Sequence, residues 1–132
     1  MNAIPESHRD LVTEEKKAFA SLATSMEDGS PHVTPVWFDV EGDFLRINTV
    51  KGRVKDRNMT ARKKVAVLII DPEDPYRYIH IRGTVAAARE EDAVEHTHIL
   101  ARKYLGVEKN PWHEGQSRVI FLIKADTVST MG

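Results

Sequence analysis

The stretch NTVKGRVKDRN, from Asn48 to Asn58, lies between two apolar segments and is the most informative part of the sequence. Positions 51–64 carry seven Lys or Arg side chains against one Asp, a local balance of +6, whereas the whole chain has a net charge of −1. The rest of the chain therefore carries about −7. Such a basic island is either a solvated helix face, the usual place for Lys and Arg, or a binding site for an anion.

Length and composition predict one domain, residues 1–132, with a hydrophobic core. Hydrophobic residues make up 41% of the chain and charged residues 30%, as is typical of a globular protein. Cysteine is absent, which excludes disulfides, thiolate metal ligands and a cysteine nucleophile. The longest apolar run, Val65–Ile70, is too short to span a membrane, and the first residues do not have the pattern of a signal peptide. We therefore expect a cytoplasmic protein without a membrane partner.

Before the basic stretch, the pattern predicts one helix and three strands. A helix is expected over His8–Ser21, because its apolar residues fall on one face. Strands are expected over Phe19–Ser25, His32–Val40 and Phe44–Val50, joined by short turns rich in Asp and Gly, and together they predict an antiparallel meander. Pro35 lacks a backbone N–H group, so its strand is expected at a sheet edge, at a bulge or at a gap in the pairing.

After the basic stretch, the pattern predicts two helices and three strands. The continuous apolar segment is typical of a strand that is covered on both faces. Gly83 is the expected site of a bulge, and Gly106 is the expected end of the second helix. The predicted elements are helix Val54–Ala61, strand Val65–Ile70, strand Tyr76–Ala88, a helix from Glu91 to Gly106, the loop Asn110–Gln116 and strand Arg118–Val128.

These elements predict an α+β, mainly β fold, a small barrel of six to seven mostly antiparallel strands with flanking helices. The chain resembles the pyridoxamine 5'-phosphate oxidase-like split β-barrel flavoproteins, and within them the small flavin- or deazaflavin (F-420)-dependent oxidoreductases. The segments that carry the resemblance are Ala20–Thr24, Pro31–Phe38, Leu45–Asn58 and Lys64–Asp71. The resemblance implies a homodimer with two cofactors at the interface and a small-molecule substrate.

The resemblance also implies that the basic stretch binds the phosphate of the cofactor. Arg53 and Lys55 are then the phosphate ligands, and Gly52 lets the backbone come close. The residue chemistry agrees, because phosphate is bound by Arg forks, by ammonium groups and by the free N–H groups of a turn that enters a helix. The segments Pro35–Phe38 and Gly52–Asn58 are most similar to the F-420 branch, so F-420 is favoured over flavin mononucleotide (FMN).

Further cofactor contacts follow from the same resemblance. They are Thr34, Pro35 and Val36 along the ring, Asn48 and Thr49 beneath it, Asn58 as a polar contact, and Tyr76 and Tyr78 near the cofactor held mainly by the other subunit. Packing in the dimer interface is an equal alternative for the two tyrosines. Because the cofactor carries the hydride chemistry, no catalytic residue is identified beyond Tyr78 and His80 as weak candidates for a proton donor.

The implied reaction is hydride transfer between the cofactor and a small unsaturated organic substrate. True pyridoxamine phosphate oxidation is not expected, because the chain ends at Gly132 without a basic segment, and Asp39 stands where a lysine for a substrate phosphate is wanted. One alternative is a nucleic-acid or anion-binding module, which the pI of about 6.6 and the absence of interleaved aromatic residues disfavour. Another is a flavin-binding dimer without turnover.

The histidines do not predict a metal site. His96 and His98 are two apart on a predicted helix and therefore point in different directions, roughly 200° apart. In the loop before the last strand, Trp112 and His113 belong either to a substrate lid or to an ordinary surface loop.

Overall fold

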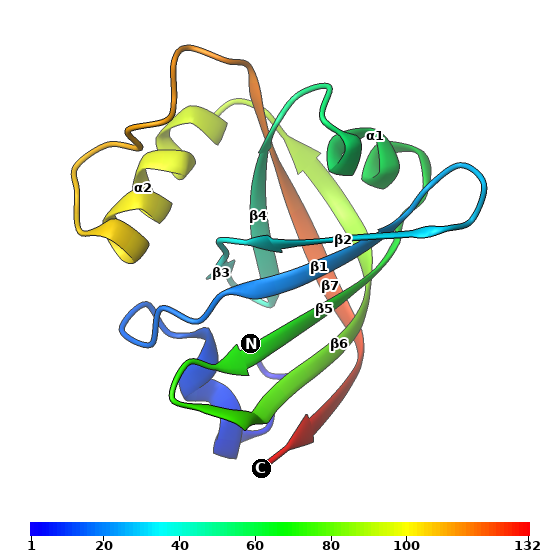
Figure 1. Ribbon diagram of the computed structural model, residues 1–132, viewed down its shortest axis with the longest axis vertical. Helices are drawn as coiled ribbons and strands as arrows, with labels where there is room; N and C mark the ends of the chain where they lie inside the picture. The colour runs from blue at the N-terminus through cyan, green and yellow to red at the C-terminus, as the bar shows by residue number, and fades with distance from the viewer.

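The computed structural model describes residues 1–132 and contains seven strands in one sheet, two α-helices and one 3₁₀ helix (Figure 1). The elements are η1 (Glu6–Val12), β1 (Ala20–Ser25), β2 (Pro31–Val36), β3 (Asp39–Glu41), β4 (Phe44–Val50), α1 (Val54–Ala61), β5 (Lys64–Asp71), β6 (Asp74–Arg89), α2 (Ala93–Leu105) and β7 (Arg118–Met131). Every strand pair is antiparallel, and the strand order is β2-β1-β5-β6-β7-β4-β3. The predicted α+β, mainly β split-barrel class is confirmed.

The predicted helix over His8–Ser21 is wrong, because the chain forms only the short 3₁₀ helix η1 and enters β1 at Ala20. Lys17 has a positive φ of 54°, which a continuing helix does not allow. Contacts distant in sequence also hold η1 in place: the Arg77 guanidinium of β6 lies 2.6 Å from the Asp10 carboxylate. Tertiary contacts therefore override the helical periodicity of the local sequence.

Both hairpins of the predicted meander form, but the predicted three-stranded meander does not. β2 pairs with β1, β3 pairs with β4, and the two hairpins lie at opposite ends of the sheet. The predicted single strand His32–Val40 is divided at Trp37 and Phe38, where the chain leaves the edge of one hairpin and enters the other. Phe38 is fully buried at this crossing, and its carbonyl accepts a hydrogen bond of 2.7 Å from Lys103. Pro35 does lie in an edge strand, as predicted.

Strand β5 is not covered on both faces within one chain, contrary to the prediction. Val65, Val67 and Ile69 are buried, whereas Leu68 is half-buried and Ile70 is 37% exposed. The alternation means that one face of β5 points into the core and the other points outward.

Helix α1 and strand β4 have the predicted bounds. The two predicted glycine roles are confirmed as well. The register of β6 against β7 shifts at Gly83, where a Cβ atom would lie 2.7 Å from the carbonyl oxygen of Lys124. Gly106 ends α2 in the left-handed conformation with φ 69°.

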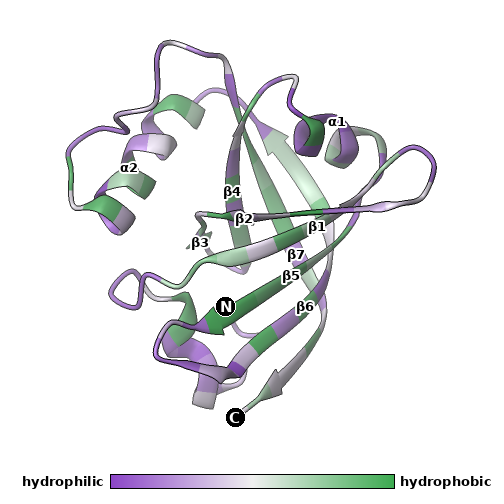
Figure 2. Ribbon diagram, in the orientation of Figure 1, coloured by the Kyte–Doolittle hydropathy of each residue, from purple (hydrophilic) through white to green (hydrophobic).

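The main core is a cluster of 18 buried hydrophobic residues enclosed by the coiled sheet. Phe38 and Phe121 are its largest fully buried side chains. Figure 2 shows apolar residues concentrated along the strands and polar residues in the loops. Helix α1 packs on β1 and β4, and α2 packs on β4 and β7, so the two helices flank one end of β4. Neither helix has the length and apolar character needed to cross a membrane.

Candidate functional site

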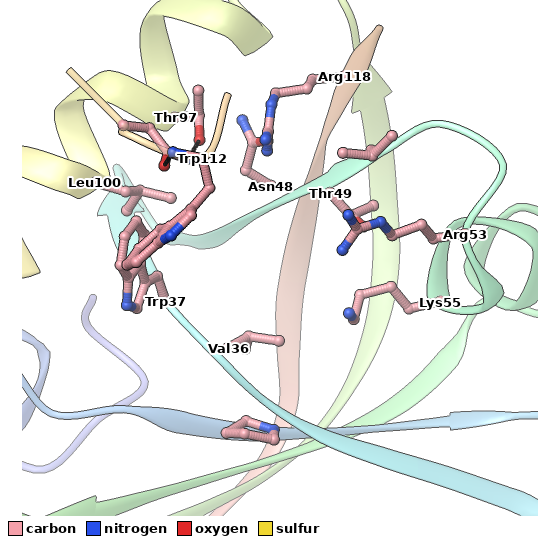
Figure 3. A pocket seen from close by; sticks show the side chains of 13 residues that line it. Val36, Trp37, Asn48, Thr49, Arg53, Lys55, Thr97, Leu100, Trp112 and Arg118 are labelled. Carbon is pink, nitrogen blue, oxygen red and sulfur yellow. Dashed lines mark hydrogen bonds between the residues drawn. The ribbon is translucent and has the colours of Figure 1, made fainter. Parts of the chain in front are cut away.

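A pocket of about 400 Å³ opens between the two helices, at the place where the coiled sheet brings its terminal hairpins face to face (Figure 3). Edge strand β2 forms one wall, β4 and the start of α1 form another, and α2 with the loop that follows it forms a third. Six of the predicted cofactor contacts line the pocket: Pro35, Val36, Asn48, Thr49, Arg53 and Lys55. The fold therefore brings together residues that are separated by up to twenty positions in the sequence.

Three cationic side chains face this pocket without an anionic partner. They are Arg53, Lys55 and Arg118, and no carboxylate lies within 4.0 Å of any of them, whereas seven other Lys and Arg residues of the chain form ion pairs. Burial and the neighbouring Arg53 lower the pKa of Lys55, and the same two causes lower the pKa of Arg118. The pocket wall thus holds positive charge that an incoming anion would neutralise.

The backbone at the start of α1 adds to this positive wall. Gly52 adopts φ 93°, a conformation that favours glycine, and its N–H donates to the Asp56 carboxylate at 2.7 Å. Arg53 is the N-cap residue, and no side chain caps the helix. The first N–H groups of α1 therefore have no partner within the helix. Together with the helix dipole, they form a suitable binding site for a phosphate group.

A buried network fixes Asn48 from behind the pocket. Its amide nitrogen donates to the carbonyl of Ala93 at 2.7 Å and lies 3.2 Å from Nδ1 of His96. Nε2 of His96 lies 2.9 Å from Asp39, which can only accept, so this nitrogen carries the hydrogen. Arg46 contacts Asp39 through two bonds of 2.8 and 2.6 Å. Burial raises the pKa of Asp39, but the hydrogen bonds from His96 and Arg46 outweigh it and hold that pKa below its usual value.

Aromatic rings form the wall opposite the cations. Trp37 stacks on Tyr104 with ring centroids 5.3 Å apart, and Phe19 stacks on Tyr104 at 5.1 Å. The Tyr104 hydroxyl donates to the carbonyl of Ala18 at 2.7 Å, which fixes the middle ring. Trp112, 63% exposed, lies 6.1 Å from Trp37 with the rings tilted by 47°. A planar ligand in the pocket would therefore meet a rigid aromatic surface.

The loop before β7 contributes one wall of the pocket. Asn110 fastens it to α2: its N–H donates to His98 at 3.0 Å and its side-chain amide donates to Thr97 at 2.9 Å. Trp112 follows and lines the pocket. His113 does not line the pocket, and its Nδ1 accepts a hydrogen bond of 2.8 Å from Arg118.

The structure does not bring every predicted cofactor contact into the pocket. Asn58 is buried between α1 and β1, where its amide donates to Thr24 at 3.0 Å and accepts from Arg62 at 3.1 Å. Its hydrogen-bonding groups are used to hold the helix on the sheet. Thr34 lies beside the pocket on β2, and its hydroxyl is the only buried side-chain oxygen without a hydrogen-bond partner.

The remaining predicted residues lie on β6, outside the pocket of their own chain. Tyr76 is 80% exposed, and Tyr78 and His80 are half-buried. His80 pairs with Leu68 of β5 and therefore shares the outer face of the sheet with it. Any contact between these three side chains and a ligand in such a pocket requires a second subunit. No group of three His, Asp or Glu side chains is arranged to hold a metal ion.

Arg118, His96 and Trp37 are the site residues that sequence reasoning missed. Arg118 is a single basic residue at the start of a strand, 65 positions beyond Arg53, and nothing in the local sequence connects the two. His96 was considered only as a metal ligand, although its position on an inward helix face is a signal for a buried polar partner. Trp37 directly follows the predicted contact Val36, and this adjacency could have identified it as a pocket residue.

The comparisons with known proteins agree on one family. The family model described as pyridoxamine 5'-phosphate oxidase matches residues 4–132. A solved structure named F420 reductase is 32% identical, with 96% of this chain and 98% of that chain covered and a TM-score of 0.84. A conserved hypothetical protein of Mycobacterium tuberculosis is 20% identical, with coverage of 97% and 84% and a TM-score of 0.73. General stress protein 26 of Bacillus anthracis is 20% identical, with coverage of 94% for both chains and a TM-score of 0.66. No curated protein matches the sequence.

Proposed function

The chain belongs to the pyridoxamine 5'-phosphate oxidase family, and we propose that it is an oxidoreductase that binds a deazaflavin of the F-420 type, or FMN, in the pocket between β2, β4 and α1. One observation carries the proposal: Arg53 and Lys55, without carboxylate partners, lie at the uncapped start of α1 and line the same pocket as the edge strand β2. A phosphate at α1 and a planar ring along β2 match these two walls.

The residues of the pocket fit the parts of such a cofactor. Arg53 presents a planar fork and Lys55 a mobile ammonium group, and both bind phosphate oxygens with charge-assisted hydrogen bonds. The unpartnered hydroxyl of Thr34 and the backbone of Pro35 and Val36 lie along the strand that would contact the ring. A buried hydroxyl without a partner is unfavourable in the free protein, and a polar ring atom would satisfy it.

When bound, the deazaflavin or flavin ring supplies the hydride chemistry. The residues of the chain position the ring and shield it from water. Trp37 and Leu100 present apolar surface to it, and Asn48, held by His96, presents a fixed polar group. No Asp, Glu, His or Tyr lines the pocket. The protein residues of one chain therefore hold the reactants and exclude water, and a proton for the substrate comes from solvent or from a second subunit.

F-420 is favoured over FMN for two reasons. The solved structure that is 32% identical is named F420 reductase and covers nearly the whole chain. In addition, the pocket holds three unpaired cations, more than a single phosphate group requires. The substrate is then a small unsaturated organic molecule that fits beside the ring, against Trp37 and Trp112.

A homodimer is part of the proposal. The outer face of the sheet carries apolar side chains that a single chain leaves exposed. They are Ile70 at 37%, half-buried Leu68 two residues before it on β5, and Phe19 at 56%, which directly precedes β1. Removing such a surface from water is favourable at about 25 cal/mol per Å². In the dimer, Tyr76 and Tyr78 would extend toward the pocket of the partner, and Tyr78 or His80 would be available as a proton donor.

The proposal is tested by titrating the purified protein with F-420 and with FMN and following cofactor fluorescence. We expect saturable binding of at least one cofactor. Arg53→Gln and Lys55→Gln each remove one charge-assisted hydrogen bond worth about 1.5–3 kcal/mol, so each should weaken binding by about 10- to 150-fold. Arg57→Gln is the matched control, because Arg57 is an exposed residue of the same helix that does not line the pocket.

Three results would contradict the proposal. Binding of both cofactors no tighter than to an unrelated protein refutes the cofactor assignment. Equal effects of Arg53→Gln and the control Arg57→Gln refute the phosphate assignment. A monomer by light scattering at micromolar concentration, with cofactor bound, refutes the dimer. Oxidation of reduced F-420 in the presence of a panel of unsaturated carbonyl compounds then tests turnover.

A further inference from the structure

We propose that Arg118 forms a second anion-binding subsite in the pocket, for a carboxylate or phosphate group distinct from the phosphate held by Arg53 and Lys55. This inference rests on the proposed function, because it assigns a ligand group to another part of the same pocket. Arg118 is the first residue of β7 and is half-buried. Its side chain lies on the α2 side of the pocket, away from Lys55 (Figure 3).

The guanidinium of Arg118 is only partly used by the protein. It has five N–H donors. Nε donates to Nδ1 of His113 at 2.8 Å, and Nη1 donates to Oδ1 of Asn48 at 3.2 Å. Three N–H donors remain, which is enough for a carboxylate or phosphate to bind in the two-pronged manner typical of arginine. The two acceptors, His113 and Asn48, carry no negative charge, so the positive charge of Arg118 is not neutralised within the protein.

Three other arginines differ in this respect, whereas Arg62 is also half-buried and donates only to neutral acceptors, the Ser25 carbonyl and Asn58. Arg46 is held by Asp39 and Glu41, Arg77 by Asp10 and Asp71, and Arg89 by Glu41 and Asp92. Each of these guanidinium groups therefore has two carboxylates. Arg118 is half-buried, yet it has no carboxylate partner. A partly buried cation without a counter-ion is unfavourable unless a ligand supplies one.

The direction of the Arg118 side chain is set before any ligand arrives. Asn48, its acceptor, is fixed by the Ala93 carbonyl and by His96, and His96 is fixed by the buried Asp39. This chain of hydrogen bonds reaches from the buried side of the sheet to the pocket. A preorganised donor loses little conformational freedom on binding, so the contact can be strong.

The subsite is separate from the phosphate site at α1 but close enough to feel its charge. The positive charge of Arg53 contributes to the lowered pKa of Arg118, after the larger effect of burial. Two cations that repel each other in the free protein are both stabilised when two anionic groups are bound. The second group is therefore an acid on the tail of the cofactor or an acid on the substrate, and both have the same chemistry.

The experiment uses the full chain, Arg118→Gln and Arg57→Gln as the matched control, each checked for folding by thermal unfolding. FMN provides one phosphate group, F-420 provides a phosphodiester with tail carboxylates, and benzoate added to the FMN-bound protein provides a separate acid, with benzamide as its neutral counterpart. Arg118→Lys is a second variant, because it keeps the charge if the glutamine variant is unstable. Pyrophosphate titrated into the cofactor-free protein is a probe that needs no cofactor.

Loss of F-420 affinity by about tenfold or more in Arg118→Gln, with FMN affinity within threefold of wild type, assigns the subsite to the cofactor tail. A tenfold loss confined to benzoate assigns it to the substrate. Equal losses for FMN and F-420 overturn the inference, because Arg118 then belongs to the first phosphate site. Unchanged binding of F-420, benzoate and pyrophosphate also overturns it. If wild type binds neither cofactor, the proposed function fails, whereas a tenfold loss of pyrophosphate affinity would still support the subsite.

Discussion

Lys103 is an ammonium group buried without a carboxylate partner, and its titration should be visible in the stability of the protein. Its side chain lies on α2 and is only 6% exposed. Nζ donates to the carbonyl of Phe38 at 2.7 Å and lies 4.3 Å from the centroid of the Phe38 ring. Burial lowers the pKa of Lys103 from 10.5 to about 8, although the charges of Asp39 and Glu14 oppose the change.

The sign of the pH effect follows from this lowered pKa. Between pH 8 and 10.5 the unfolded chain keeps a proton on Lys103 that the folded protein has lost, so the free energy of unfolding rises with pH in this window. Below about pH 8 both forms are protonated, and the full penalty for burying the charge is present. A pKa difference between 10.5 and about 8 corresponds to roughly 3 kcal/mol.

Substitution by methionine isolates this contribution, because Lys103→Met keeps most of the buried stem and removes the charge. Urea unfolding of wild type and Lys103→Met is compared at pH 7.5 and pH 10.5. We expect the stability of wild type relative to the variant to increase by roughly 3 kcal/mol over this range, since all other titrating groups are common to both proteins. A difference that stays constant with pH would refute the reasoning.

Three further predictions concern the sheet, the buried network and the pocket. Gly83→Ala places a Cβ atom 2.7 Å from a backbone carbonyl of β7, so we expect urea unfolding to show a loss of about 1–3 kcal/mol; unchanged stability would show that β6 can shift. Asp39→Ala leaves His96 and Arg46 without their carboxylate and should lower the unfolding free energy by about 3–5 kcal/mol, and a loss below about 1 kcal/mol contradicts this. FMN affinity should fall as pH rises, at a lower pH than expected for an ordinary lysine, because burial and Arg53 lower the pKa of Lys55. Lys55→Arg should remove the fall, and an affinity in wild type that does not fall before an ordinary lysine would titrate opposes the assignment.

Local sequence signals were sufficient where an element depends on its own residues. Helix α1 and strand β4 have the predicted bounds, since a glycine turn and a strict alternation specify them. The helix expected over His8–Ser21 failed because the ion pairs of Arg77 and the positive φ of Lys17 are not encoded in local periodicity. The meander failed for a related reason: turn signals predict hairpins, but they do not tell which distant strand, β5 for β1 or β7 for β4, completes the pairing.

The candidate site shows the same difference between residues that local sequence signals identify and residues that long-range pairing brings in. Arg53 and Lys55 could be predicted because they belong to one dense basic stretch that enters a helix, and both line the pocket. Arg118 could not, because it is brought to the pocket by the long-range pairing of β7 with β4, where it lies opposite Val50. Asn58 has the right position in the sequence, but its amide donates to Thr24 of β1 and does not reach the pocket.

The most direct test of cofactor binding at α1 is the position of the phosphate in a crystal structure of the protein with F-420 or FMN. We expect the phosphorus density between the side chains of Arg53 and Lys55 at the start of α1, with the ring along Pro35 and Val36 of β2. Phosphate density elsewhere, with Arg53 and Lys55 free of any contact to the cofactor, would contradict the proposed function.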